Sequence, residues 1–440
     1  MLANETGKTA LLAKALGEAG NLLLYRGILE DPVCRAMLRF LRAVRGKSES
    51  EAFAELFFLL SRHAGPGDAW QNHLLDLVLY DDNAFTREAA AGADRMSESL
   101  KAAARTDLRI LHNLFRVDAS VVRESLGSEH LWRDLGSGRA AGQTAIRTVL
   151  SGARDWSDCL EQLAAYHQEA GAGLFARYHA FRWRDRLEGI ETPDPVALDD
   201  LVGYRSQRRI VVANTERFLA GLPANNILLY GDRGTGKSST VKALLNRYRD
   251  RGLRMVEVAK ADLADFPRIV RQLRGSSLCF ILFVDDLSFE EDEVEYKELK
   301  AVLEGGLEAR PVNVLIYATS NRRHLVRERF SDRQPEYGDN GEVRTGDTVQ
   351  EKLSLADRFG ITVLFTAPDK ALYLDIVRGL ARRGGVTLPD DELTRRALVW
   401  EVWQNGRSGR TARQFVDQIS GDGEWQDFPA VRDGTDSGQG

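Results

Sequence analysis

The stretch GDRGTGKSST, residues 231–240, directly follows the apolar run ILLY at 227–230. It fits the pattern G-x-x-x-x-G-K-[ST], in which glycines let backbone N–H groups turn toward phosphate oxygens. The lysine of such a loop reaches the β and γ phosphates, and the hydroxyl that follows it can ligate Mg²⁺. We therefore expect a nucleotide to be held by Gly231, Gly234, Thr235, Gly236, Lys237, Ser238 and Ser239.

The residues on both sides of this loop have the patterns that it requires. The run at 227–230 predicts a buried strand, and Val241, Leu244, Leu245 and Tyr248 recur at helical spacing after the loop. The N-terminus of that helix would add its dipole to the attraction for phosphate. The sequence thus predicts a strand–loop–helix unit that binds phosphate.

A second apolar run, SLCFILFVDDLSF at 277–289, ends in two acids, Asp285 and Asp286. The carboxyl ends of parallel strands meet at one edge of a sheet, so these acids should lie beside the phosphates. We expect Asp285 to hold Mg²⁺ together with Ser238, and Asp286 to position or deprotonate the attacking water.

A third run, VNVLIYATSNRRH at 312–324, carries Thr319, Ser320 and Asn321 at its end. A polar side chain at this strand end would lie between the phosphate loop and the acids, where it can orient a water molecule against the γ-phosphate. Among the three residues, we select Asn321 for this role.

Strand and helix patterns divide the chain into regions. Up to residue 188 the apolar residues recur at helical spacing, and HAFRWRDRL at 179–187 is interpreted as a solvated helix face. GIETPDPVALDD at 189–200 has the prolines and acids of a linker. Strand candidates then alternate with helices to 366, which predicts an α/β domain at 201–366 with a parallel sheet covered on both faces. A helical region at 367–420 and a mostly disordered tail at 421–440 complete the predicted organisation.

Composition excludes several classes of protein. The chain has 440 residues, of which 43% are hydrophobic, as in a folded globular protein. Its formal charge of −5 gives no overall electrostatic signal for nucleic acid. Cys34, Cys159 and Cys279 are scattered, without the spacing of a metal site. No apolar run is long enough to cross a bilayer, so we expect a cytoplasmic protein without a membrane partner.

These elements, in this order, resemble those of the AAA+ ATPases. More narrowly, the chain resembles an uncharacterised bacterial AAA+ family, domain of unknown function 815, in the segments NTERFLAGLPANNILLYGDRGTGKSS, FVDDLSFE, YATSNRRHL, EKLSLADRFG and SGRTARQF. The motifs extend from about residue 201 to 415. The resemblance implies a P-loop core with a five-stranded parallel sheet in the order 5-1-4-3-2, a C-terminal helical lid and ATP with Mg²⁺ as ligands.

The resemblance also implies roles for further residues. Adenine would be held near LVGY at 201–204, by Val202 and Gly203. Arg358 matches the position of an arginine finger that is donated to a neighbouring subunit, which implies a homo-oligomer, either a ring or a partial ring. Arg410 matches the lid arginine that reaches the bound phosphates, with Arg413 as an alternative.

Two features depart from the common AAA+ pattern. Many AAA+ motors have Asp-Glu where this chain has Asp285 and Asp286, so hydrolysis would be slow or would be assisted by Glu290 or Glu291. The polar stretch at 331–350 has no strand or helix pattern, and is either a pore or partner loop or a plain flexible connection.

Three functions fit the sequence. The first is an ATP-hydrolysing AAA+ machine that remodels an unknown protein client in an oligomer. The second is an ATP-gated, oligomerising switch that hydrolyses slowly. The third is a DNA-associated ATPase of the initiator or helicase-loader type, suggested by basic runs at 248–254 and 322–330 but unsupported by charge or by interleaved aromatic residues.

Overall fold

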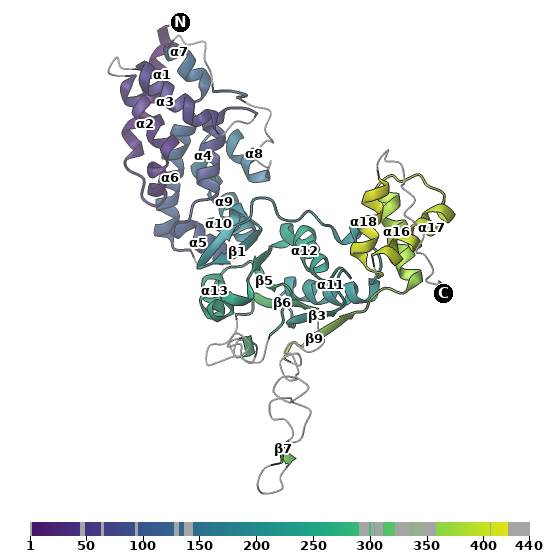
Figure 1. The fold of residues 1–440 in the computed structure, drawn as a ribbon. Coiled ribbons are helices and arrows are strands. Elements are labelled where there is room, and N and C mark those ends of the chain that lie inside the picture. The colour runs from purple at the N-terminus through teal and green to yellow at the C-terminus, as the bar shows by residue number, and fades with distance from the viewer. Residues whose placement is uncertain are drawn as a thin grey trace, which may run out of the picture.

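The computed structural model describes residues 2–44, 49–62, 66–92, 96–126, 132–135, 144–289, 299–300, 303, 311–321, 336–337, 343–344, 358–404 and 406–420. A seven-stranded sheet lies at the centre of the molecule, between an N-terminal group of helices and a C-terminal one (Figure 1). Its strands are β1 (Ala180–Arg184), β2 (Arg186–Gly189), β3 (Ile227–Gly231), β4 (Leu253–Glu257), β5 (Cys279–Val284), β6 (Val314–Ser320) and β9 (Ile361–Phe365).

The strand order of the sheet is β2-β1-β4-β5-β6-β3-β9. Every neighbouring pair is parallel except β1 and β2. Counted alone in chain order, β3, β4, β5, β6 and β9 have the expected order 5-1-4-3-2. The α/β fold and this order are confirmed, and the sheet is larger than predicted by two strands.

The two additional strands correct the interpretation of residues 179–187 as a helix. Apolar Phe181 and Trp183 alternate with exposed arginines, and this period of two is that of a strand. The Trp183 side chain is buried, and its Nε1 donates to Asp265 Oδ2 at 2.9 Å. Because β1 pairs with β4, the sheet begins before the predicted linker at 189–200. The division into domains stays a prediction.

Helices cover both faces of the sheet, as predicted. Along β3, Ile227 and Leu229 pack with α11 (Arg205–Leu219) and α12 (Lys237–Tyr248), whereas Leu228 packs on the opposite face with α13 (Phe266–Leu273). Burial of both faces explains why the β5 and β6 sequences are nearly continuous apolar runs. The carboxyl ends of these strands are left to form a site.

The described N-terminal residues are helical, as predicted up to the start of β1. The helices are α1 (Leu2–Ala19), α2 (Pro32–Ala43), α3 (Glu49–Ser61), α4 (Ala69–Leu79), α5 (Ala84–Ala91), α6 (Glu98–Phe115), α7 (Ala119–Leu126), α8 (Ala145–Gly152), α9 (Leu160–Ala170) and α10 (Leu174–Arg177). All of them except α10 contribute to one apolar core, which includes the fully buried Trp70 and Trp156. At the other end of the chain lie α16 (Lys370–Arg383), α17 (Asp390–Trp403) and α18 (Gly409–Ile419). Among the described helices, none combines the length and apolarity needed to span a bilayer.

A buried arginine joins the N-terminal helices to the sheet. Arg254 in β4 is 2% exposed and donates to the carbonyl oxygens of Ala170, at the end of α9, and of Phe175, at 2.8 and 3.0 Å. Burial lowers the pKa of Arg254 to about 10, so the guanidinium stays charged at neutral pH. Carbonyl acceptors on both sides therefore compensate a cation that would otherwise be costly to bury.

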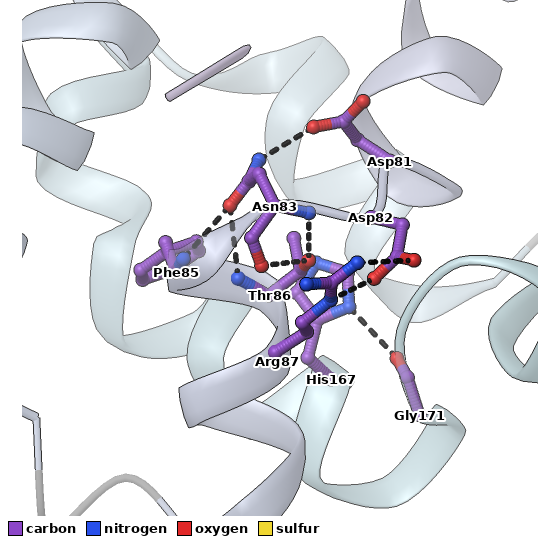
Figure 2. A network of polar contacts seen from close by, with 8 residues as sticks. All are labelled: Asp81, Asp82, Asn83, Phe85, Thr86, Arg87, His167 and Gly171. Carbon is purple, nitrogen blue, oxygen red and sulfur yellow. Dashed lines mark hydrogen bonds and ion pairs between the residues drawn. The ribbon is translucent and has the colours of Figure 1, made fainter. Parts of the chain in front are cut away.

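Next to this junction, polar contacts order the start of α5 (Figure 2). Asn83 Oδ1 accepts from the backbone N–H groups of Phe85 and Thr86.

His167 of α9 is fully buried, and its Nδ1 donates to the Gly171 carbonyl oxygen at 2.9 Å. Its Nε2 has no hydrogen-bond partner among the described residues, so the ring is neutral. Burial lowers the pKa of His167 to about 4.

This histidine predicts a dependence of stability on pH. Since the folded-state pKa lies below the ordinary value, its contribution is present above about pH 6.5 and is lost as the pH falls toward 4, by about 3 kcal/mol in total. The His167→Asn variant keeps a donor for Gly171 and does not titrate, so its free energy of unfolding should fall less steeply over this range. Burial also lowers the pKa of His179 to about 4, so some slope remains. Equal slopes in denaturant titrations of the two proteins would contradict the assignment.

Two short strands correct the expectation for the stretch at 331–350. β7 (Glu336–Tyr337) pairs antiparallel with β8 (Val343–Arg344). The sequence between them, GDNGE, is rich in the residues that hairpin loops favour. The other residues of the stretch at 331–350 lie outside the described ranges. The same holds for Glu290 and Glu291, for the basic run at 322–330 and for the tail at 421–440.

Candidate functional site

The phosphate loop connects β3 to α12 at the carboxyl edge of the sheet, as predicted. Gly231 has a φ of 127°, and a Cβ atom there would lie 2.1 Å from the Phe365 carbonyl oxygen in β9. No side chain fits at that distance. Gly236 has a φ of 90° and immediately precedes α12, where the left-handed conformation lets the chain enter the helix. The glycines in the pattern are therefore required by backbone geometry.

Lys237 points into the centre of this edge. Its Nζ donates to the carbonyl oxygens of Gly231 and Asp232 at 2.9 and 2.7 Å, and to Asn321 Oδ1 at 3.0 Å. The residue is only 6% exposed, and burial lowers its pKa. The loop thus holds a cation against its own backbone.

The end of β5 places a carboxylate against the start of α12. Asp285 Oδ1 accepts from Ser238 Oγ at 2.6 Å and from Thr319 Oγ1 at 2.5 Å. The structure brings together the two residues predicted to share Mg²⁺. Their oxygens are hard ligands of the kind that Mg²⁺ prefers, with phosphate and water supplying the others. Among the described residues, no three His, Cys, Asp or Glu side chains gather as a self-sufficient metal site.

Asn321 connects the lysine to the second acid. Its Oδ1 accepts from Lys237, and its Nδ2 donates to Asp286 Oδ1 at 2.5 Å. Asp286 has a φ of 50°, and its backbone N–H donates to Thr319 Oγ1 at 3.0 Å. Strand ends far apart in the sequence therefore meet within hydrogen-bond distance at the phosphate loop.

A cavity of about 660 Å³ opens beside these residues. One end is polar and the other is largely apolar. The polar end includes Gly234, Thr235, Gly236, Lys237, Ser238, Ser239, Asp285, Asp286, Thr319 and Asn321. The largely apolar end includes Val196, Leu201, Val202, Tyr204, Ile376 and Leu380, together with the charged Asp200 and Arg208. The shape suits a ligand with an apolar ring system and a charged, phosphate-like part.

Both candidate lid arginines reach the polar end. Arg410 and Arg413 of α18 line the cavity, so the structure does not separate them. Sequence reasoning passed over several other polar lining residues, among them Arg208, Arg233 and Thr319. Arg233 stands at a position that the loop pattern leaves free, and Thr319 precedes Asn321 by two residues at the same strand end. The position of Thr319 at the end of this strand could therefore have identified it as a site residue from the sequence.

At the apolar end, the segment at 201–204 is held by the C-terminal helices. Val202 lines the cavity, whereas Gly203 does not. Gly203 has a φ of 80° and faces Leu372 of α16 instead. Within the described ranges, no hydrogen bond engages the backbone N–H or C=O of Val202. One donor and one acceptor are therefore available at this end. Tyr204 Oη donates to the Thr366 carbonyl oxygen at 2.7 Å and fixes the segment to the chain after β9.

Arg358 lies away from this cavity. It precedes β9 by three residues, at the amino edge of the sheet, whereas Gly231 pairs with Phe365 at the carboxyl end of β9. The five residues of β9 separate the two edges by a distance on the order of 15 Å. Arg358 is thus not among the residues that line the cavity of its own chain.

Comparison with protein families identifies one family model that matches the chain. The family model described as "Protein of unknown function (DUF815)" matches residues 176–423, which is more than half of the chain. The chain belongs to the DUF815 family. Its DUF815 region begins just before β1 and ends just after α18, so the family includes the whole seven-stranded sheet and the C-terminal helices. The resemblance inferred from the sequence is confirmed.

Two solved structures are similar to parts of this DUF815 chain. The Thermotoga maritima RuvB Holliday junction branch migration motor has 17% identity and a TM-score of 0.34, and covers 51% of this chain. A mutant of the same RuvB has 16% identity, a TM-score of 0.35 and the same coverage. The DUF815 chain covers 64% of each of these structures. At these values the likeness says nothing about activity. No curated protein matches the chain.

Proposed function

We propose that this DUF815 protein binds ATP with Mg²⁺ and hydrolyses it in a homo-oligomer, as an AAA+ ATPase that remodels an unknown protein client. The observation that carries the proposal is the convergence of Lys237, Asp285 and Asn321 at one end of a cavity whose other end is apolar. Each of these residues comes from a different element of the sheet edge, and each has the chemistry that phosphoryl transfer requires.

The residues of the polar end have separable roles in this proposal. The Lys237 ammonium donates to the carbonyl oxygens of Gly231 and Asp232 and is already positioned at the loop. When ATP binds, phosphate oxygens replace these carbonyl oxygens as its acceptors. Asp285 and Ser238 hold Mg²⁺, which supplies charge neutralisation at the phosphates. Asp286 accepts the proton of the attacking water or positions that water, and Asn321 orients Asp286 through its Nδ2.

The apolar end supports adenine as the base. Adenine presents an amino donor next to a ring-nitrogen acceptor, which complement the C=O and N–H of Val202. The side chains around Val202 at this end, including Ile376 and Leu380, would cover the faces of the ring. Burial in such a pocket is the usual way in which a protein holds a flat aromatic ligand.

The placement of Arg358 supports an oligomer. An arginine at the opposite edge of the sheet can complete the phosphate site of a neighbouring subunit but not that of its own chain. Donation of such a cation in trans stabilises the charge that develops during phosphoryl transfer. Assembly and hydrolysis would then be coupled.

A second candidate function is a slow, ATP-gated switch. The observation that favours it is the contact between Asp286 and Asn321, because a short carboxylate already held at 2.5 Å is constrained in reaching a water. A role on DNA gains nothing from the described part of the basic run at 248–254. There the Tyr248 ring is 2% exposed, between Arg247 and Arg251, and is not free to stack on a base.

Steady-state ATP hydrolysis, measured across a range of protein concentrations, tests the proposal. Specific activity should rise with protein concentration, since each site is completed by a neighbour. The Asp286→Asn variant keeps an acceptor for Asn321 but has no carboxylate base, so its turnover should fall by at least about 100-fold while ATP binding is kept. Undiminished turnover in this variant would exclude Asp286 as the base. Tight ATP binding without turnover in the wild type, at every concentration, would favour the switch.

A further inference from the structure

The C-terminal helices touch the phosphate loop backbone to backbone. Gly409 is the first residue of α18, and a Cβ atom on it would lie 2.9 Å from the Gly234 carbonyl oxygen. From the other side, a Cβ atom on Gly234 would lie 2.9 Å from Ser408 Oγ. A main-chain oxygen cannot rotate away as a side chain can. The contact therefore requires the absence of a side chain at position 409, and a Cβ atom on Gly234 would also crowd the Cβ atoms of Ser408 and Arg410 at 3.0 and 3.2 Å.

A second contact of the same kind lies at the apolar end of the cavity. Gly379 is buried in the middle of α16, and a Cβ atom on it would lie 2.5 Å from Val202 Cγ2 and 3.1 Å from Val202 Cγ1. Val202 lines the cavity, and its backbone N–H and C=O have no hydrogen-bond partner among the described residues. The C-terminal helices thus meet the rest of the protein at both ends of the cavity, each time through a glycine.

Local backbone conformation does not explain these two glycines. Neither Gly379 nor Gly409 has a φ in the left-handed region, in contrast to Gly203, Gly234 and Gly236. Alanine is the better helix former, so a glycine inside α16 or at the start of α18 weakens the helix. Close approach of another part of the chain is the remaining physical reason for a glycine at these places.

We propose that Gly379 and Gly409 are positioning residues that set how closely the C-terminal helices rest on the two ends of the nucleotide cavity. This inference rests on the proposed function. Gly409 acts through its neighbour Arg410 and through Arg413 one turn later, whose distance from the phosphate loop it determines. Gly379 acts through Val202, and therefore on the recognition of the base.

Substitutions at the two positions should change different kinetic constants. In Gly409→Ala the start of α18 must move away from Gly234, so kcat should fall at least about tenfold, with KM for ATP changed much less, because a small misplacement at the reacting end slows the chemical step. In Gly379→Ala the displaced side chain is that of Val202, so KM and Kd for ATP should rise about tenfold, with kcat nearly unchanged. Alanine strengthens both helices but displaces a neighbour, so the thermal midpoint of the protein without nucleotide should shift by no more than about 5 °C in either variant.

Gly17→Ala is the matched control, because Gly17 lies within α1 and a Cβ atom there would meet nothing within 4 Å. Its kinetics should equal those of the wild type. Wild-type activity with unchanged kcat, KM and Kd in both lid variants would overturn the inference and leave the proposed function intact. A wild type that neither binds nor hydrolyses ATP would overturn both. A thermal midpoint lowered by much more than about 5 °C in either variant would show that the glycine serves the fold, and this would overturn the positioning role.

Discussion

Replacing Lys237 by alanine should weaken ATP binding by at least about 100-fold, which is the largest effect that we expect on affinity. Among the described contacts, only the lysine Nζ connects the carbonyl oxygens of Gly231 and Asp232 to Asn321 Oδ1. Its loss removes the cation that would face the phosphates. Titration calorimetry with ATP and Mg²⁺ measures the change directly.

Lys242 supplies a matched control on the same helix. Its Nζ lies 3.8 Å from Asp194 Oδ2, and it does not line the cavity. Lys242→Ala removes the same charge from α12, so it should leave ATP affinity within about twofold of the wild type, since a surface ion pair contributes little. Normal affinity in Lys237→Ala would overturn the proposed ATP site.

Replacing Arg358 by alanine should remove hydrolysis and spare binding. Loss of a cation donated in trans lowers turnover by about 1,000-fold or more in enzymes that use one. ATP affinity should stay within about twofold, because Arg358 is remote from the cavity of its own chain. The rise of specific activity with protein concentration should disappear. Hydrolysis assays beside binding titrations separate the two effects.

A mixing experiment makes this prediction specific to neighbouring subunits. Arg358→Ala and Lys237→Ala are each expected to be inactive, but an Arg358→Ala subunit can bind ATP while its Lys237→Ala neighbour supplies Arg358. In an equal mixture half of the subunits bind ATP and half of the neighbours carry the arginine, so about a quarter of the sites should be intact. Failure of the mixture to recover any activity would contradict donation between subunits.

Much of the candidate site could be predicted from the sequence. Asp285 and Asn321 each follow an apolar run, and the carboxyl ends of parallel strands converge, so their proximity to Lys237 followed from topology. Gly231 and Gly236 could be recognised because the loop pattern reflects a backbone need that any such loop has. The roles of these residues in catalysis stay predictions.

Other features could not be predicted, because they depend on contacts between distant parts of the chain. In β1 the alternating pattern spans only five residues and contains three charged or strongly amphipathic side chains, which also suit a helix surface. Gly379 belongs to none of the quoted segments, and Gly409 lies in SGRTARQF without any sign of what it contacts, so the importance of both depends on where Val202 and Gly234 lie in space. Arg410 and Arg413 lie one turn apart on α18, so both reach the same cavity.

The way in which β1 and Arg254 join the sheet determines where the chain can be divided. A fragment that starts at residue 201, after the predicted linker, would lack β1 and expose the β4 edge as a template for aggregation. The same cut would remove the Ala170 and Phe175 carbonyl groups and leave the Arg254 guanidinium without two of its acceptors. A shorter expression product that keeps the seven-stranded sheet whole must therefore retain at least β1, and one that also keeps Arg254 satisfied must retain the end of α9.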